Sequence, residues 1–269
     1  MSRMAEEGNM MTFEGHLEVL RKMLFRVAIV TLIFSCVIFA FKDFTFSVLL
    51  APSKWDFITY NWIEKVCRLF NPGFRFEEFH IDLIATDLSS QFMTHISTSV
   101  YLGLLCASPF ILFELFRFVS PALLESERKY STQIVIIIYL LFVLGVLMSY
   151  YILFPISFRF LGTYSVADQV HSTITLDSYI STFVTLTLLM GLVFQLPIIA
   201  FVLAKMRFVR SEFLIKYRQY AFLTICVVAA IITPPDVMTL ILVAVPLYLL
   251  YEVSIKVIKR VENTTAPAD

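Results

Sequence analysis

Apolar stretches long enough to cross a lipid bilayer constrain this chain more than any other feature of its sequence. Between Lys22 and Lys42, for example, Arg26 is the only charged residue. A run of that length provides the roughly 20 helical residues that a bilayer core demands. The chain as a whole is 59% hydrophobic and only 16% charged, far more apolar than a soluble domain. Backbone groups in lipid must be satisfied internally, so we predict an all-α, polytopic membrane protein.

The apolar runs divide the chain into a single membrane domain over residues 23–256. We predict six transmembrane helices, at about residues 23–41, 92–116, 134–154, 179–204, 220–233 and 237–251. Residues 1–22 have apolar side chains at helical spacing, which indicates an amphipathic segment lying on the membrane. No small-residue cleavage site follows the first run, so it is interpreted as a retained span. A long outer loop over 42–91 and a polar tail over 257–269 complete the prediction.

The last two predicted spans are short. At 1.5 Å per residue each covers about 21 to 23 Å, less than the roughly 30 Å of hydrocarbon. The turn between them, Thr233 to Asp236, reads Thr-Pro-Pro-Asp and is too short for anything but a tight connection. The pair therefore forms a hairpin that thins the bilayer or is shielded by a partner. The alternative is a re-entrant pair, which the charge pattern disfavours.

Positive charges set the orientation. If the N-terminus is inside, the inner segments hold 15 Lys and Arg residues and the outer loops hold six. Because positive residues favour the cytoplasmic side, we expect both termini in the cytoplasm of a cell inner membrane. The loop between the second and third spans then also lies inside.

That inner loop, residues 118–129, carries the densest cluster of charge between two spans. Ser120 and Pro121 are typical of a helix start, since the hydroxyl caps a free amide and proline needs no partner. Two leucines follow and would dock on the membrane, which leaves Glu125 and Glu127 in water beside two basic residues. We expect an acidic recess able to attract a cationic peptide. The alternative is an ordinary charged loop.

Three polar residues interrupt the apolar runs, where such groups usually face a cavity or a partner. Glu114 and Glu252 lie close to span ends, so the simpler interpretation lets both carboxylates reach water. Gln195 lies deeper, and its amide requires a hydrogen-bonding partner that hydrocarbon cannot supply. We expect a helix–helix contact for Gln195, within this chain or with another subunit.

No signature of catalysis or of metal binding occurs in the sequence. Motifs of metalloproteases, serine hydrolases, phosphate loops and paired cysteines are all missing, and the four cysteines stand far apart. The chain is therefore predicted to be non-enzymatic and without a cofactor. Its charges balance at 21 against 21, which excludes a general nucleic-acid binder. A secondary transporter or channel with its site near Gln195 remains an alternative, although the unequal spans lack the matching halves of many transporters.

Six short motifs, in order, make the chain resemble the TatC family, the core receptor of the twin-arginine translocation system. They are His16-Leu17-x-x-Leu20-Arg21-Lys22, Ala51-Pro52, Phe118-x-x-Pro121-Ala122-Leu123, Glu127-Arg128, Phe154-Pro155 and Thr233-Pro234-Pro235-Asp236. The resemblance extends from about residue 12 to residue 260.

The resemblance implies a receptor and assembly platform that exports folded proteins using the proton-motive force. Its expected partners are twin-arginine signal peptides, small single-span subunits of the TatA or TatB type, further copies within a larger complex, and membrane lipid. Signal-peptide binding would fall to Glu127, Glu18, Arg21 and Glu125. The family usually has a glutamate three residues after the histidine, where this chain has Val19, and Glu18 stands one place earlier.

The same resemblance assigns roles elsewhere in the chain. Gln195, where the family often has glutamate, and Thr233, at the end of the short fifth span, would contact the small partner subunits. Five residues belong to the family's motifs: Pro52, Pro121, Pro234, Pro235 and Asp236. The segment from Trp55 to Phe79 is longer than the corresponding loop of familiar relatives, and its Trp55, Tyr60 and Trp62 suit an interfacial position.

Overall fold

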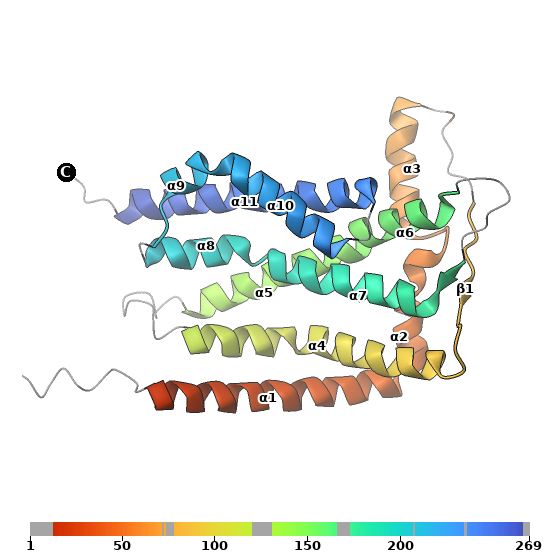
Figure 1. Cartoon of the computed structure of the whole chain (residues 1–269), viewed down its shortest axis with the longest axis horizontal. Helices are drawn as coiled ribbons and strands as arrows, with labels where there is room; N and C mark the ends of the chain where they lie inside the picture. Colours follow the sequence, from red (N-terminus) through yellow and green to blue (C-terminus); the bar gives the residue numbers. More distant parts are fainter. Residues whose placement is uncertain are drawn as a thin grey trace, which may run out of the picture.

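The computed structural model is a bundle of helices that run along one common direction, with a cap of shorter elements at one end (Figure 1). It describes residues 13–71, 73, 78–119, 131–165, 173–206, 208–233 and 236–265. Among these residues, five helices are long and apolar enough to cross a membrane: 17–40, 90–118, 134–163, 176–205 and 237–263. The mostly helical architecture is therefore confirmed, with five long candidate spans and one shorter apolar helix among the described residues.

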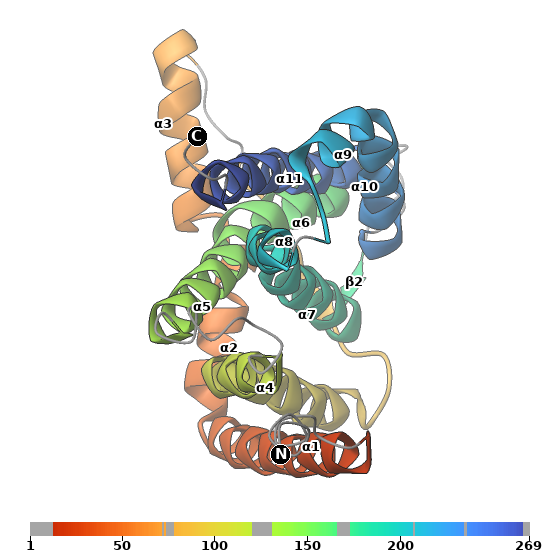
Figure 2. The ribbon, with the colours of Figure 1, turned by 90° about the vertical axis from the view of Figure 1, so that its left-hand side faces the viewer.

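Helix α1 (Phe13–Ala40) is continuous, which differs from the expected surface segment followed by a separate span. The sequence change near residue 22 marks a change of polarity and not a change of backbone conformation. Helix α4 (Ser90–Val119) packs antiparallel along α1, and Figures 1 and 2 show the two side by side. Gly103 makes this approach possible, because a Cβ there would lie 2.8 Å from the backbone nitrogen of Ser35.

The third span does not end at Pro155, contrary to the prediction. Helix α5 (Ser131–Met148) passes through a π-helical turn, η4 (Ser149–Leu153), into α6 (Phe154–Thr163). Proline lacks the N–H that would have bonded the carbonyl of Tyr151. The hydroxyl of Thr59 donates to that carbonyl instead. The wider turn and this outside donor let the helix continue past the proline.

The fourth span is interrupted where a single helix was expected. Helix α7 (Leu176–Val193) ends in a turn at Phe194 and Gln195, and α8 (Leu196–Lys205) continues from it with a proline at its start. Gly145 of α5 lies close to the backbone of α7, since a Cβ there would lie 2.5 Å from the carbonyl oxygen of Met190. Helices α5 and α7 thus pack at the closest distance that backbones permit.

The C-terminal part contains α9 (Ser211–Lys216), α10 (Arg218–Ile232) and α11 (Val237–Thr265). The prediction that the last two spans are both short is wrong for the second. Helix α10 has 15 residues, whereas α11 has 29. The apolar run of α11 stops near Tyr251, but an amphipathic continuation buries Ile258 and Val261 against α8 and α9. The side chains of α11 therefore become more polar after Tyr251, while the helix itself continues.

The predicted outer loop over 42–91 is largely structured. It contains α2 (Lys42–Leu49), a 3₁₀ turn η1 (Ala51–Ser53), α3 (Ile58–Phe70) and the strand β1 (Leu83–Ile84). Strand β1 pairs in parallel with β2 (Ile174–Thr175), so the connections before α4 and before α7 are joined. These elements gather at the end opposite to the start of α1 and the end of α11 (Figure 1).

The main core lies around α7, where α5, α6, α10 and α11 converge. Tyr179, Phe154 and Phe183 form its aromatic centre, with ring centroids of Phe154 at 4.9 and 5.0 Å from the other two. Edge-to-face packing of this kind adds to the stabilisation from burial alone. The core therefore fixes the C-terminal helices together, while α1 and α4 form a pair at one side of the bundle (Figure 2).

Candidate functional site

The clearest polar site within the bundle is an ion pair between α1 and α4. A guanidinium nitrogen of Arg26 lies 2.9 Å from a carboxylate oxygen of Glu114. Glu114 is only 4% exposed, so the interpretation that its carboxylate reaches water is wrong. The carboxylate instead pairs with the guanidinium of Arg26 on the neighbouring helix. This pairing offsets the desolvation cost of burying its charge. The pair fixes the relative height of the two helices near the start of α1 and the end of α4.

About two turns nearer the start of α1, the predicted ligand Glu18 is exposed. Its carboxylate lies 2.7 Å from the ammonium of Lys22, four residues later on the same helix. Exposed pairs of this spacing contribute little to stability, because water and salt screen them. Glu18 can therefore exchange Lys22 for an incoming cation at little cost. A guanidinium is the stronger competitor, since it bonds a carboxylate through two parallel N–H groups.

Arg21 lies on the exposed side of α1 and lines a recess of about 510 Å³ with Lys22, Phe25 and Arg26. Three of the four lining side chains are basic, and Phe25 is apolar. Arg21 lies within one helical turn of Glu18, and its part in peptide binding stays a prediction.

The loop that should complete this site lies outside the described residues. Pro121, Glu125 and Glu127 belong to it, so their expected places stay predictions. The structure does show where the helix before this loop ends. Helix α4 is described up to Val119, next to the first turns of α1 (Figures 1 and 2). A loop that starts there begins within reach of Glu18.

Gln195 lies in the middle of the bundle, at the break between α7 and α8. Its side-chain amide donates to the carbonyl oxygen of Ile138 on α5, at 3.2 Å, and to that of Gly191, at 3.4 Å. The side chain is buried. The expected helix–helix contact is thus made within this chain, and the predicted contact with another subunit stays a prediction.

The other predicted residues lie toward the opposite end from Glu18. Thr233 is buried at the end of α10, where its hydroxyl donates to the carbonyl of Ala229 at 2.9 Å. Asp236 accepts from the backbone N–H of Thr239 at 2.6 Å and so caps α11. Pro52 is buried in η1. Pro234 and Pro235 lie outside the described residues. The predicted residues therefore form two separate groups and not one site.

Tyr60 links the outer elements to the bundle. Its hydroxyl lies 2.9 Å from the carbonyl oxygens of both Pro52 and Pro155. Burial raises the pKa of this phenol above its ordinary value, with the nearby Arg159 guanidinium acting in the opposite direction. Tyr60 therefore stays protonated, as a hydrogen-bond donor, throughout the physiological range. Tyr60 is buried within the protein, so its ring does not face lipid, and the interfacial position of its segment stays a prediction.

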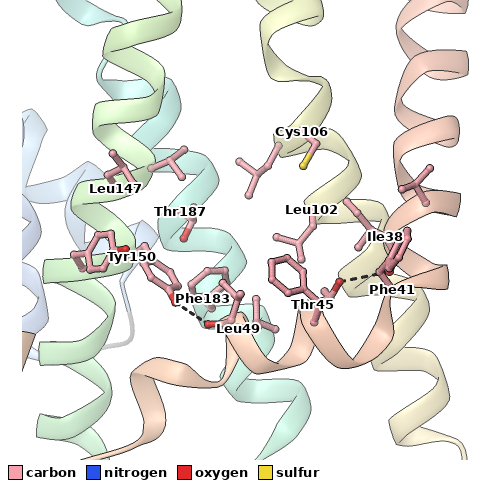
Figure 3. Close-up of a pocket in the computed structure, with 16 residues that line it drawn as sticks. Ile38, Phe41, Thr45, Leu49, Leu102, Cys106, Leu147, Tyr150, Phe183 and Thr187 are labelled. Atoms are coloured by element: carbon pink, nitrogen blue, oxygen red, sulfur yellow. Dashed lines mark hydrogen bonds between the residues drawn. The ribbon is translucent and has the colours of Figure 1, made fainter. Parts of the chain in front are cut away.

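An apolar groove of about 670 Å³ lies between α1, α2, α4, α5 and α7. Figure 3 shows Phe41, Leu102, Leu147 and Phe183 around it. Its polar edge includes the Tyr150 hydroxyl, which donates to the carbonyl of Val48 at 2.7 Å. The sequence contains no sign of this groove, because its lining comes from five helices that are distant in the chain.

Two ion pairs were also missed. Besides Arg26 and Glu114, Arg218 of α10 lies 2.8 Å from Glu252 of α11. A usable signal existed for both: each pair joins antiparallel helices, and its members lie at similar distances from the ends that meet. Among the described residues there is no cluster of His, Cys, Asp and Glu side chains that could hold a metal ion.

Comparisons with known proteins agree over nearly the whole chain. The family model for TatC, "Sec-independent protein translocase protein (TatC)", matches residues 15–246. A Sec-independent protein translocase protein TatC from a Blattabacterium species is 34% identical over 94% of this chain and 96% of its own length. The TatC protein of Carboxydothermus hydrogenoformans is 33% identical over 95% of this chain and 96% of its own.

The fold has a solved counterpart. The crystal structure titled "Twin Arginine Translocase Receptor- TatC" superposes with a TM-score of 0.73 and 31% sequence identity. The match covers 92% of this chain and 99% of that one.

Proposed function

The chain belongs to the TatC family of Sec-independent protein translocase proteins, and we propose that it binds twin-arginine signal peptides at the α1–α4 end of its bundle. Its role as core subunit of this translocase follows from the family, which is a translocase component and not a known enzyme family. Neither the relatives nor the matching structure supports the alternative of a solute transporter. We propose that this chain takes part in the export of folded proteins using the proton-motive force.

One observation carries the proposed site: the exposed carboxylate of Glu18 lies on α1 beside the end of α4, from which the acidic loop departs. Glu127 and Glu125 in that loop would supply the remaining negative charge. Two carboxylates at a membrane boundary suit two neighbouring guanidinium groups, because the low dielectric of the lipid strengthens charge-assisted hydrogen bonds. Arg21 would orient the loop carboxylates when no peptide is bound.

The membrane topology we propose has six crossings, with α10 as the short fifth one and both ends of the chain in the cytoplasm of the inner membrane. Helix α1 begins and α11 ends at the same end of the bundle, as an even number of crossings requires (Figure 1). This orientation assigns 15 of the 21 Lys and Arg residues to inner segments of the sequence. This orientation exposes Glu18 to signal peptides before export.

We also propose that small single-span subunits pack against the short helix α10. Its outward side chains Phe222, Leu223, Val227 and Ile231 are exposed in the isolated chain. A short apolar helix leaves part of the bilayer thickness unmatched, and a neighbouring helix relieves this mismatch. Thr233 at its end and Gln195 deeper in the bundle lie on the elements that would meet this partner or further copies of the chain.

Replacement of Glu127 by alanine tests the peptide site. We expect crosslinking of a twin-arginine signal peptide to fall at least about tenfold, a loss of about 1.4 kcal/mol of binding free energy. The measurement is photocrosslinking in membranes that contain the full chain, with a twin-lysine peptide as a reference. Replacement of Glu212, an exposed acid on α9, is the matched control and should leave crosslinking unchanged.

A second variant tests Glu18. Glu18→Ala should reduce crosslinking, and the added substitution Val19→Glu should restore part of it by returning a carboxylate to the neighbouring position. If Glu127→Ala and Glu18→Ala both insert normally and bind the peptide as the unmodified chain does, the proposed site is wrong.

A further inference from the structure

Helix α3 has two chemically different faces along its length. On a helical wheel its large apolar residues fall on one side and its charged and amide residues on the other. The apolar side contains Ile58, Trp62, Ile63, Val66, Leu69 and Phe70. The polar side contains Asn61, Glu64, Lys65 and Arg68, with Glu64 and Arg68 paired to each other.

The apolar side of α3 is largely uncovered by the rest of the described chain. Leu69 is 81% and Phe70 is 87% exposed, and Ile58 and Trp62 are exposed as well. Trp55, just before the helix, is also exposed. Such a set of large apolar side chains on one helix is costly in water and requires a cover.

The helix lies crosswise to the membrane-spanning helices. In Figure 1 the spans run along the long axis, while α3 stands across it, level with the end of α1 where the outer elements begin. Figure 2, turned by 90°, shows the same crosswise direction and shows α3 projecting beyond α11. Since spans lie close to the membrane normal, α3 lies close to the membrane plane.

Tertiary contacts at its first turn hold α3 in this direction. Thr59 donates to the freed carbonyl of Tyr151, and Tyr60 bonds Pro52 and Pro155. Phe57, just before the helix, stacks on the ring of Tyr151 with centroids 5.9 Å apart. The remaining turns carry the exposed side chains away from the bundle. The orientation is therefore built into the core and does not depend on a partner.

From these observations we propose that α3 is an outer-leaflet anchor: it lies in the headgroup layer, with Trp62, Leu69 and Phe70 inserted toward the acyl chains and its polar side in water. Tryptophan is enriched at this depth of a membrane, and amphipathic helices bind there through a buried apolar face. Large apolar side chains of the span α11, such as Val245 and Leu249, are exposed as well. The anchor would set the depth of the outer cap in the bilayer.

The chain contains a convenient reporter, because its only two tryptophans are Trp55 and Trp62. The variant Trp55→Phe leaves Trp62 as the sole indole. The purified full chain is reconstituted into vesicles of phosphatidylcholine and phosphatidylglycerol. Quenching of its fluorescence is then measured with lipids brominated either near the headgroup, at carbons 6 and 7, or deeper, at carbons 11 and 12.

We expect the shallow bromines to quench Trp62 about twofold, and the deep bromines to quench it less, as for an interfacial helix. The matched control moves the indole to the polar side of the helix, in the triple variant Trp55→Phe, Trp62→Phe and Arg68→Trp. Arg68 is exposed on that side, so this variant should fold, which circular dichroism checks. Its indole should resist the bromines and be quenched by aqueous acrylamide instead.

Two results would overturn the proposal. Equal quenching of both indole positions, with strong acrylamide quenching, would place α3 in water. A blue-shifted Trp62 that neither bromines nor acrylamide quench would mean that protein, such as a second copy of the chain, covers this face. Both readouts depend on the depth of α3 alone, so they are separable from signal-peptide binding.

Discussion

At the scale of single residues, the pair of Arg26 and Glu114 shows that the two members of an ion pair need not be equivalent. Arg26 is about half exposed, whereas Glu114 is almost fully buried between α1 and α4. Removal of the arginine leaves a buried charge without compensation, while removal of the glutamate leaves an arginine that can still reach water. The arginine is therefore the more sensitive member.

We predict that Arg26→Met lowers the free energy of unfolding by about 3 kcal/mol, because it leaves the Glu114 carboxylate unpaired. Glu114→Gln should cost about 1 kcal/mol, since the amide keeps one hydrogen bond. The double variant should cost less than the sum of the two. Denaturant titration in detergent measures all three.

The control for this prediction is Lys22→Met, which breaks the exposed pair with Glu18. Its effect on the free energy of unfolding should be far smaller than that of Arg26→Met. A loss on Glu114→Gln as large as that on Arg26→Met would contradict the unequal burial on which the argument depends.

At the scale of elements, prolines and glycines decide how the helices continue and how closely they pack. Pro155 frees the carbonyl of Tyr151, and the chain satisfies it with a hydroxyl from α3, distant in sequence. One tertiary hydrogen bond thus serves two elements: it completes the third span and fixes the direction of α3. Gly145, which has no side chain, lets α5 pack closely against α7.

Thr59→Val should destabilise the protein by about 1 kcal/mol, because it removes the hydroxyl that donates to the part-buried carbonyl of Tyr151. The matched control is Thr224→Val on α10, whose exposed hydroxyl bonds only the carbonyl of Tyr220 in its own helix. That change should have almost no effect. Thermal unfolding followed by circular dichroism compares them, and similar losses in both variants would count against the account of Pro155.

Gly145→Ala should cost about 1–3 kcal/mol, since the added methyl group meets the backbone of Met190, which cannot move aside. Gly73→Ala is the control, because the nearest atom to a Cβ there lies at 3.7 Å, an ordinary contact distance. Unfolding in detergent provides the comparison. A neutral Gly145→Ala would mean that α5 and α7 lie farther apart than the structure places them.

At the scale of the whole molecule, the bundle is polarised between its two ends. Glu18 and Arg21 lie at one end with the last turns of α11, and the elements α2, α3, β1 and β2 gather at the other (Figure 1). The hairpin of α10 and α11 extends less far toward the second end than α6 and α7 do. The proposed peptide site and the elements α2, α3, β1 and β2 therefore lie at opposite ends of the bundle.

Cysteine labelling tests this polarity. With the native cysteines replaced, Ser126→Cys should react with a membrane-impermeant maleimide only after the cells are permeabilised. Asn61→Cys, on the polar side of α3, should react in intact cells, because that face is exposed on the outer side. Labelling of Ser126→Cys in intact cells would reverse the orientation and remove the peptide site from the cytoplasm.

Local sequence patterns were sufficient to predict the membrane helices of this protein and its family. Apolar runs located the membrane helices, Thr233 to Asp236 marked the last turn, and the order of short motifs identified the family. These features are readable because hydropathy, turn chemistry and motif spacing each depend on neighbouring residues alone.

Only the tertiary structure decided how Glu114 and Gln195 are satisfied, why the third span passes Pro155, how far α11 extends, and in which direction α3 points. Each of these depends on which helix lies alongside. A buried charge, amide or freed carbonyl is stabilised by a partner from another segment, and sequence spacing does not encode that partner.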